Sequence, residues 1–256
     1  MPFNFRRKPK PVYVRNVLVL DFRPMGIPQG WRSTESLVQE HLEAMMQASH
    51  KMLIFKVIKI LKINSYPLLM DGRQYNDVTW TQTVQNSQSA LRDLRGNYML
   101  ADYQRIIKDY SILQAIQGRL IDEVWMFGGP YFGFYESRMV GKGAYWCNAP
   151  ALEMDGRRFI MMGFNYQRGG QEMIHSFGHR AESILARYFG SQEFQNKLYA
   201  AQPIPAPKNE FEQWLLQHGT VHRTPGGADY GQNEFSWVSA MKNEWWPLVV
   251  DPNKVA

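Results

Sequence analysis

Two histidines stand four residues apart in the stretch QEMIHSFGHRAESIL. The spacing of the apolar residues predicts a helix over residues 171–189, with His175 and His179 one turn apart on the same side. Glu172 and Glu182 fall on the same stripe, each three residues outside the histidine pair. Two imidazoles in this arrangement can bind one metal ion together. The stripe therefore predicts a metal site, and the alternative is the polar face of an ordinary surface helix.

A catalytic zinc site takes three protein ligands and leaves one position open for water. His222, in the later stretch HGTVHRTPGGADYGQNE, is the candidate third ligand, with Asp229 as its fallback and Glu182 as the alternative on the helix itself. The Pro-Gly-Gly step predicts a loop for this stretch. Water bound to such a metal is acidified towards neutral pH and can attack a carbonyl or phosphoryl group. The leading hypothesis is a zinc-type, metal-dependent hydrolase that acts on a peptide, amide or ester bond.

The general base of this hydrolase would have to come from outside the histidine pair. The familiar zinc-peptidase helix has a glutamate directly after its first histidine, and Ser176 stands at that position here. Glu136, in the glycine- and aromatic-rich stretch GGPYFGFYESRMVGKG, and Glu172 are the candidate bases. Arg138 and Arg180 are the candidates for stabilising negative charge in the transition state. The stretch around Glu136 is expected to be either a substrate-facing loop or an aromatic cap on the core.

Four segments together resemble a family of bacterial proteins of unknown function. They are GGPYFGFYESRMVGKGAYWCNAP, RRFIMMGFNYQRG, HSFGHRAES and GTVHRTPGGADYGQNEFSWVS, and the resemblance covers about residues 17–250. It implies a shared set of polar positions and no established activity. The positions that the resemblance marks are Glu136, Arg138, Asn148, His175, His179, Glu182 and His222. The late loop departs from the family pattern, because Pro225 is followed by Gly226 where an asparagine is expected.

The order of the apolar patterns predicts the fold class. Short apolar runs predict strands, and apolar residues at helical spacing predict the helices between them. The expected strands cover residues 16–22, 52–63, 121–129 and 157–164, and the expected helices cover residues 33–50, 101–120 and 171–189. This alternation is typical of an α/β fold with a mainly parallel sheet flanked by helices. Sites in such sheets lie beyond the carboxyl ends of the strands, here in the loops after Asp21, Phe127 and Phe164.

We expect a single domain with two appendages. Residues 16–200 form the α/β domain, residues 1–15 a basic N-terminal arm, and residues 201–256 a Pro-rich connector and a Trp-rich extension packed on the main domain. The arm has five basic residues and no acid, so removing them from the net charge of +6 leaves the rest at +1. The body therefore has no basic groove for nucleic acid. The arm is either a solvated tail or a docking element for an acidic protein partner or for self-assembly.

Targeting signals and cysteine content narrow the protein class further. No stretch has the length and apolar content of a transmembrane segment, and the basic start is not followed by the apolar core of a secretory signal. The single cysteine, Cys147, excludes an internal disulfide framework and suits a cytoplasmic protein. Two other functions stay open. One is a non-enzymatic structural or interaction subunit whose His/Glu cluster is a hydrogen-bond network, and the other is a hydrolase with Cys147 as nucleophile.

Overall fold

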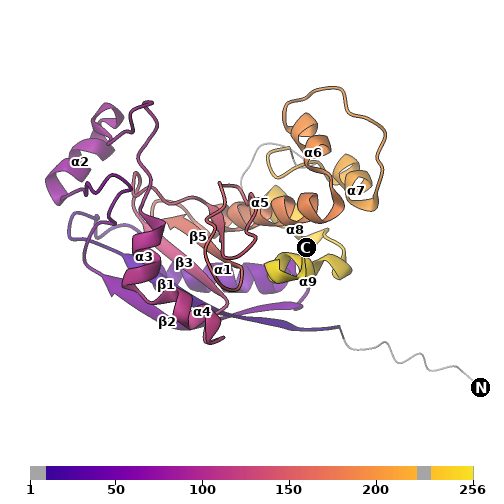
Figure 1. Cartoon of the computed structure of the whole chain (residues 1–256), viewed down its shortest axis with the longest axis horizontal. Helices are drawn as coiled ribbons and strands as arrows, with labels where there is room; N and C mark the ends of the chain where they lie inside the picture. The colour runs from indigo at the N-terminus through magenta and orange to yellow at the C-terminus, as the bar shows by residue number, and fades with distance from the viewer. Residues whose placement is uncertain (1–9, 224–231, 256) are drawn as a thin grey trace, which may run out of the picture.

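The structure is a computed structural model and describes residues 10–223 and 232–255. Within these residues the strands form one five-stranded sheet in the order β2-β1-β3-β5-β4 (Figure 1). Neighbouring strands are parallel except at one edge, where β4 runs antiparallel to β5. The strands are β1 (Tyr13–Phe22), β2 (Leu53–Ile63), β3 (Glu123–Gly128), β4 (Ser137–Val140) and β5 (Phe159–Asn165). The predicted α/β fold with a mainly parallel sheet is confirmed.

The inner strands are mainly apolar and deeply buried. Every residue of β3 is buried, and β1 is buried without interruption from Val17 to Phe22. Strands of a parallel sheet that is covered on both faces have this composition, because neither face meets water. β2 lies at the other edge, where Ile54 and Ile58 are exposed.

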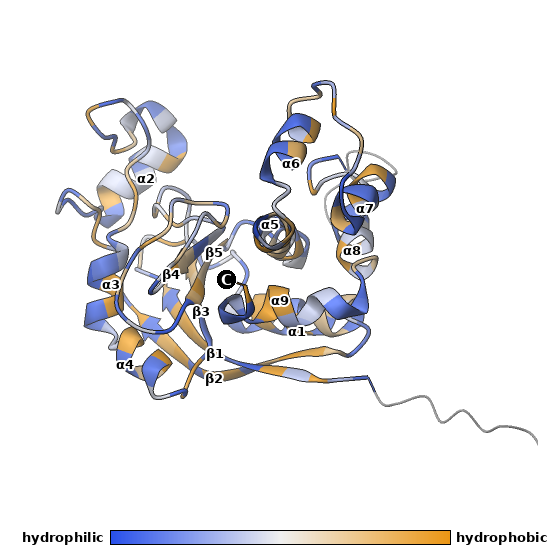
Figure 2. Ribbon diagram, turned by 45° about the vertical axis from the view of Figure 1, so that its right-hand side comes forward, coloured by the Kyte–Doolittle hydropathy of each residue, from blue (hydrophilic) through white to orange (hydrophobic). Residues whose placement is uncertain are grey.

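Helices cover both faces of the sheet. Figure 2 shows α3 and α4 on one side of the strands, with α1 and α9 on the other side, where α5 and α8 also pack. These helices are α1 (Thr34–Ala48), α3 (Tyr103–Asp109), α4 (Ile112–Gln117), α5 (Gly170–Phe189), α8 (Gln232–Ser239) and α9 (Trp246–Val250). Three further helices, α2 (Asp77–Gln85), α6 (Gln192–Tyr199) and α7 (Glu210–His218), lie further out (Figure 1). No helix in the described part of the chain is long and apolar enough to cross a bilayer.

Several elements differ from the sequence-based expectation. The helix expected over residues 101–120 is two helices, α3 and α4, because Ser111 between them adopts a left-handed conformation with φ 52°. The stretch around Glu136 was expected to lack secondary structure, yet it contains the edge strand β4. The basic arm is shorter than residues 1–15, because β1 begins at Tyr13 and the buried Arg15 pairs with Asp122 at 3.5 Å. Residues 1–9 of the arm lie outside the described residues.

Candidate metal centre

Three histidines from two distant parts of the chain come together. His175 and His179 lie on α5, and their Nε2 atoms are 3.0 Å apart. The ring of His222, in the segment after α7, has its centroid 5.0 Å from the ring of His175 and 4.7 Å from that of His179. One ligand atom from each histidine lies within 4.8 Å of the other two, so the group can hold a metal ion. Asp229, the predicted fallback ligand, lies outside the described residues.

The burial of the three rings is uneven. His175 is 3% exposed and His179 is 7% exposed, whereas His222 is exposed. Burial, followed by the nearby His179, lowers the pKa of His175, and the same two causes lower the pKa of His222. Both rings are therefore neutral at neutral pH, which is the form of imidazole that binds metals. The cluster is a partly enclosed set of imidazole nitrogens with one open side.

A buried carboxylate lies behind each of the two helical histidines. Nδ1 of His179 lies 3.3 Å from Glu182 and 3.4 Å from the Tyr199 hydroxyl, which itself donates to Glu182. Nδ1 of His175 lies 3.4 Å from Glu234 of α8. A carboxylate that accepts from Nδ1–H would set the tautomer in which the Nε2 lone pair is free for a metal ion. Both Nε2 atoms are thus directed into the space that the three histidines share.

Glu182 therefore takes a different place from the one expected of a ligand. Its Oε2 lies 3.3 Å from Nδ1 of His179, and its Oε1 accepts a 2.8 Å hydrogen bond from the Val221 backbone N–H. Both carboxylate oxygens are engaged on the far side of the ring from the shared space. Glu182 thus orients His179 and at the same time ties the segment that carries His222 to α5.

Glu136 approaches the cluster from the segment before β4. Its Oε2 lies 3.8 Å from Nε2 of His179 and accepts a 2.8 Å hydrogen bond from the Asn148 side chain. Asn148 is held in a left-handed conformation, φ 55°, and its backbone N–H donates to Ser183 of α5. The Glu136 side chain is 37% exposed. A carboxylate in this position can reach both the histidine cluster and a molecule arriving from solvent.

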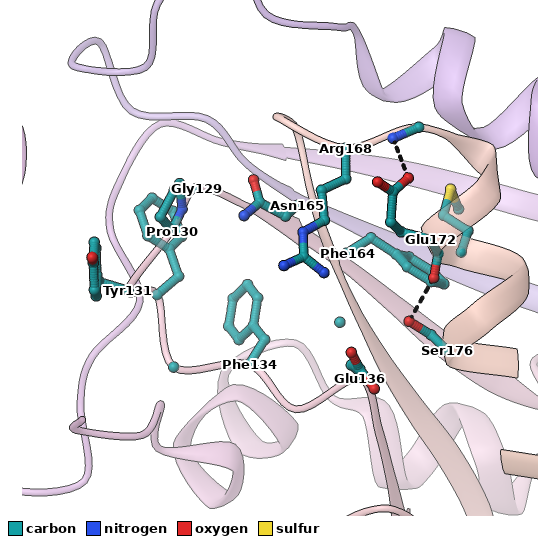
Figure 3. Close-up of a pocket in the computed structure, with 15 residues that line it drawn as sticks. Gly129, Pro130, Tyr131, Phe134, Glu136, Phe164, Asn165, Arg168, Glu172 and Ser176 are labelled. Carbon is teal, nitrogen blue, oxygen red and sulfur yellow. Dashed lines mark hydrogen bonds between the residues drawn. The ribbon is translucent and has the colours of Figure 1, made fainter. Parts of the chain in front are cut away.

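A pocket of about 250 Å³ opens beside Glu136, at the carboxyl ends of β3 and β5 (Figure 3). Its walls are the loop after β3, the turn after β5 and the first turns of α5, in agreement with two of the three loops that the sequence indicated. Gly163 of β5 allows this close packing, because a Cβ there would lie 2.5 Å from Cβ of Phe134. Glu172 lines the pocket, but its Oε2 caps α5 by accepting from the Gly169 N–H at 2.9 Å. Glu136 is therefore the freer of the two predicted bases.

The two predicted arginines do not join the site. Arg180 is fully buried on another face of α5, where it pairs with Glu123 of β3 at 2.9 Å. Arg138 donates from Nε to the Pro150 carbonyl at 2.9 Å, and its guanidinium lies 4.8 Å from the ring centroid of Tyr103. Both charges stabilise the fold instead of facing the histidines, which corrects the expectation that they stabilise a transition state.

Cys147 is poorly suited to act as a nucleophile. Its side chain is fully buried, and its Sγ lies 3.7 Å from the Ser137 hydroxyl. Burial raises the pKa of the thiol to about 11. Because the thiolate is the reactive form, a buried thiol with a raised pKa is inert at neutral pH. The fold does not favour the Cys147 hydrolase.

Sequence reasoning missed three polar residues around the cluster. Tyr199 and Glu234 support the histidines from behind, and Arg168 lines the pocket. Tyr199 lies at the end of α6, and its partner Glu182 is 17 residues away. The sequence around Tyr199 therefore does not indicate this contact. Arg168, in NYQRGG directly after a predicted strand, did carry a signal, because charged residues at that end of a parallel sheet commonly face ligands.

No family model matches the chain, and neither does any curated protein or solved structure. The resemblance to a bacterial family stays a prediction.

Proposed function

We propose that this protein is a metal-dependent hydrolase with zinc bound by His175, His179 and His222. The observation that carries the proposal is the paired orientation of the helical histidines. Each has Nδ1 against a buried carboxylate and Nε2 turned towards the third ring. This carboxylate–histidine arrangement is typical of catalytic zinc centres. Three nitrogen ligands leave one coordination position for water, and zinc lowers the pKa of that water towards neutrality.

Glu136 is the general base in this proposal. Its Oε2 is 3.8 Å from Nε2 of His179, so a water molecule beside the histidines also lies within reach of the carboxylate. Glu136 takes one proton of this water while the oxygen bonds to the carbonyl carbon of the substrate. The bond from that carbon to the leaving nitrogen or oxygen then breaks, and the leaving group receives the proton. An amide, peptide or ester is the expected substrate.

The rival interpretation is a non-enzymatic subunit whose His/Glu cluster is a hydrogen-bond network. The 3.0 Å separation of Nε2 in His175 from Nε2 in His179 favours it, because two imidazoles at this distance can share one proton. The two interpretations differ in metal content.

Elemental analysis of protein purified without a histidine tag decides between them. We expect about one zinc ion per chain, retained on dialysis and lost in the His175→Ala, His179→Ala double variant. His218→Ala is the matched control, because this ring stacks on Trp214 and bonds to its carbonyl at 3.1 Å. Metal that persists at the same level in the double variant would remove the proposed centre.

The role of Glu136 is tested separately in zinc-loaded protein with 4-nitrophenyl esters and 4-nitroanilides. Glu136→Gln keeps the size of the side chain and its bond to Asn148, so zinc content should not change. Loss of the base should lower kcat by about 10²–10⁴-fold. Glu193→Gln is the control, since Glu193 is exposed on α6, where it pairs with Lys197 at 2.8 Å. Unchanged kcat in Glu136→Gln would contradict the assignment.

A further inference from the structure

The pocket beside Glu136 contains an arginine with no role in the fold. Arg168 lies on the exposed turn between β5 and α5, and Figure 3 shows its guanidinium reaching into the pocket between Asn165 and Phe134, above Glu136. Within the described part of the chain, this guanidinium has no hydrogen bond or ion pair. Its backbone N–H alone is engaged, with the Asn165 carbonyl at 3.0 Å. A fixed positive charge is therefore available inside a concave site.

The two carboxylates that line the pocket have other hydrogen-bond partners than Arg168. Glu136 is held by Asn148 at 2.8 Å, and Glu172 accepts from the Gly169 N–H at 2.9 Å. Neither carboxylate forms an ion pair with Arg168 in the described residues. An arginine in this setting has its five donors free for a planar or tetrahedral oxyanion from outside.

Size and charge narrow the choice of oxyanion. The pocket holds about 250 Å³, which is at the small end for ligand sites, and Phe134 and Phe164 form part of its wall. The carboxylates of Glu136 and Glu172 also line it, so their negative charge opposes a phosphate dianion more strongly than a single carboxylate. An arginine can hold a carboxylate by two parallel hydrogen bonds.

We infer that Arg168 binds a free carboxylate of the substrate, so that the hydrolase acts on small carboxylate-bearing amides or esters. This inference rests on the proposed function for the cleavage step and on the pocket alone for the binding step. The carboxylate pairs with Arg168, an apolar portion lies against Phe134, and the scissile carbonyl lies towards Glu136 and His179. The bond that breaks and the protons that move are those of the hydrolysis described above.

Matched substrates test the cleavage step in zinc-loaded protein. One pair is N-benzoylglycine and N-propylbenzamide, and the other is glutaryl-4-nitroanilide and pentanoyl-4-nitroanilide, so that the carboxylate sits on either side of the amide. We expect kcat/KM to favour a carboxylate-bearing member by about 10–100-fold, the value of a charge-assisted hydrogen bond. Arg168→Ala should abolish this preference while zinc content stays constant, and Arg168→Lys should restore part of it.

Arg95→Ala is the control, because Arg95 is exposed, does not line the pocket, and has no side-chain hydrogen bond or ion pair among the described residues. Hydrolysis with equal kcat/KM for charged and neutral members, or a preference that survives Arg168→Ala, would overturn the inference and leave the proposed hydrolase intact.

Binding is measured independently of turnover, by ligand-observed NMR with N-benzoylglycine, glutarate and inorganic phosphate. We expect the wild-type protein to bind at least one carboxylate and Arg168→Ala to lose that binding. If this holds while no substrate is cleaved, the carboxylate site stands and the hydrolase proposal fails. Binding of phosphate alone through Arg168, or binding of none of the three probes, would overturn the inference.

Discussion

His41 is a fully buried histidine on α1 that behaves as an apolar ring. Its centroid lies 5.0 Å from that of Trp125 and 5.6 Å from that of Phe164. Neither ring nitrogen has a hydrogen-bond partner among the described residues, and burial lowers the pKa of His41 to about 3. The folded protein therefore keeps this ring neutral well into the acid range, whereas the unfolded chain protonates it near the ordinary value of about 6.5.

This difference predicts a pH-dependent loss of stability. Between about pH 6.5 and pH 3 the unfolded state binds the extra proton, so the contribution of His41 to the free energy of unfolding falls as pH falls, by up to about 1.4 kcal/mol per pH unit. His41→Phe removes this pH-dependent contribution and also the two ring nitrogens that have no hydrogen-bond partner among the described residues. Urea unfolding at several pH values from 7 to 4 measures the free energy of unfolding of both proteins. This free energy should rise in the variant relative to the wild type as pH decreases. A difference that stays constant over this range would contradict the prediction.

At single residues, features set by local spacing could be predicted from the sequence, whereas long-range partners could not. His175 and His179 could be placed on one side of a helix from their spacing alone, because the geometry is local. Arg180 follows His179 directly, but its partner Glu123 is 57 residues earlier on β3, and only the tertiary structure places Arg180 in the core. A polar side chain has the same local pattern whether it faces a site or a buried ion pair.

At the scale of elements, the contact between α5 and the segment after α7 sets the position of His222. A Cβ on Gly178 would lie 2.7 Å from Cγ2 of Val221, closer than such atoms approach in folded proteins. The neighbouring backbone N–H of Val221 bonds to Glu182 at 2.8 Å. The missing side chain at residue 178 therefore lets the third histidine come within reach of the first two.

We expect Gly178→Ala to weaken zinc binding by at least about tenfold, a loss comparable to that from disturbing a residue behind a zinc ligand. Helix propensity alone would make this substitution favourable by about 1 kcal/mol, so reduced affinity must come from displacement of the segment. Affinity is measured by competition with a chromophoric chelator.

The double variant Gly178→Ala, Val221→Ala is the control for that displacement, because it removes the methyl groups that the new Cβ would meet. It should recover most of the zinc affinity. Failure to recover would indicate that the helix itself, and not the approach of Val221, limits the site.

The elements that could be predicted are those with long, regular patterns. Six elements lie close to their expected bounds, since each is a mainly apolar run, an alternating strand or a helix with a clear apolar stripe: β1, β2, β3, β5, α1 and α5. β4 has only four residues and depends on pairing with β5, so its local sequence is not distinctive. The break at Ser111 is a backbone conformation that helical spacing does not indicate.

At the scale of the whole molecule, a metal ion at the histidine cluster would bridge α5, the segment after α7 and, through Glu234, α8. A ligand that binds only the folded state stabilises it by about 2.7 kcal/mol at 100 times its Kd. For a chain of this size that corresponds to a rise in Tm of about 5–10 °C. Thermal unfolding with zinc and with chelator should show this rise in the wild type and in His218→Ala. His222→Ala should show little of it, and an equal rise there would place the bound metal elsewhere.

The order of these segments along the chain has a consequence for biosynthesis. A ribosome delivers every strand of the sheet, and then His175 and His179, before it has translated the codon for His222. A nascent chain that ends between His179 and His222 therefore has the strands and two of the three histidines, but not α8 and α9, which pack on the same side of the sheet. In the proposed centre, metal uptake therefore has to wait until His222 has been translated, and a product terminated between His179 and His222 would have the strands without the third ligand.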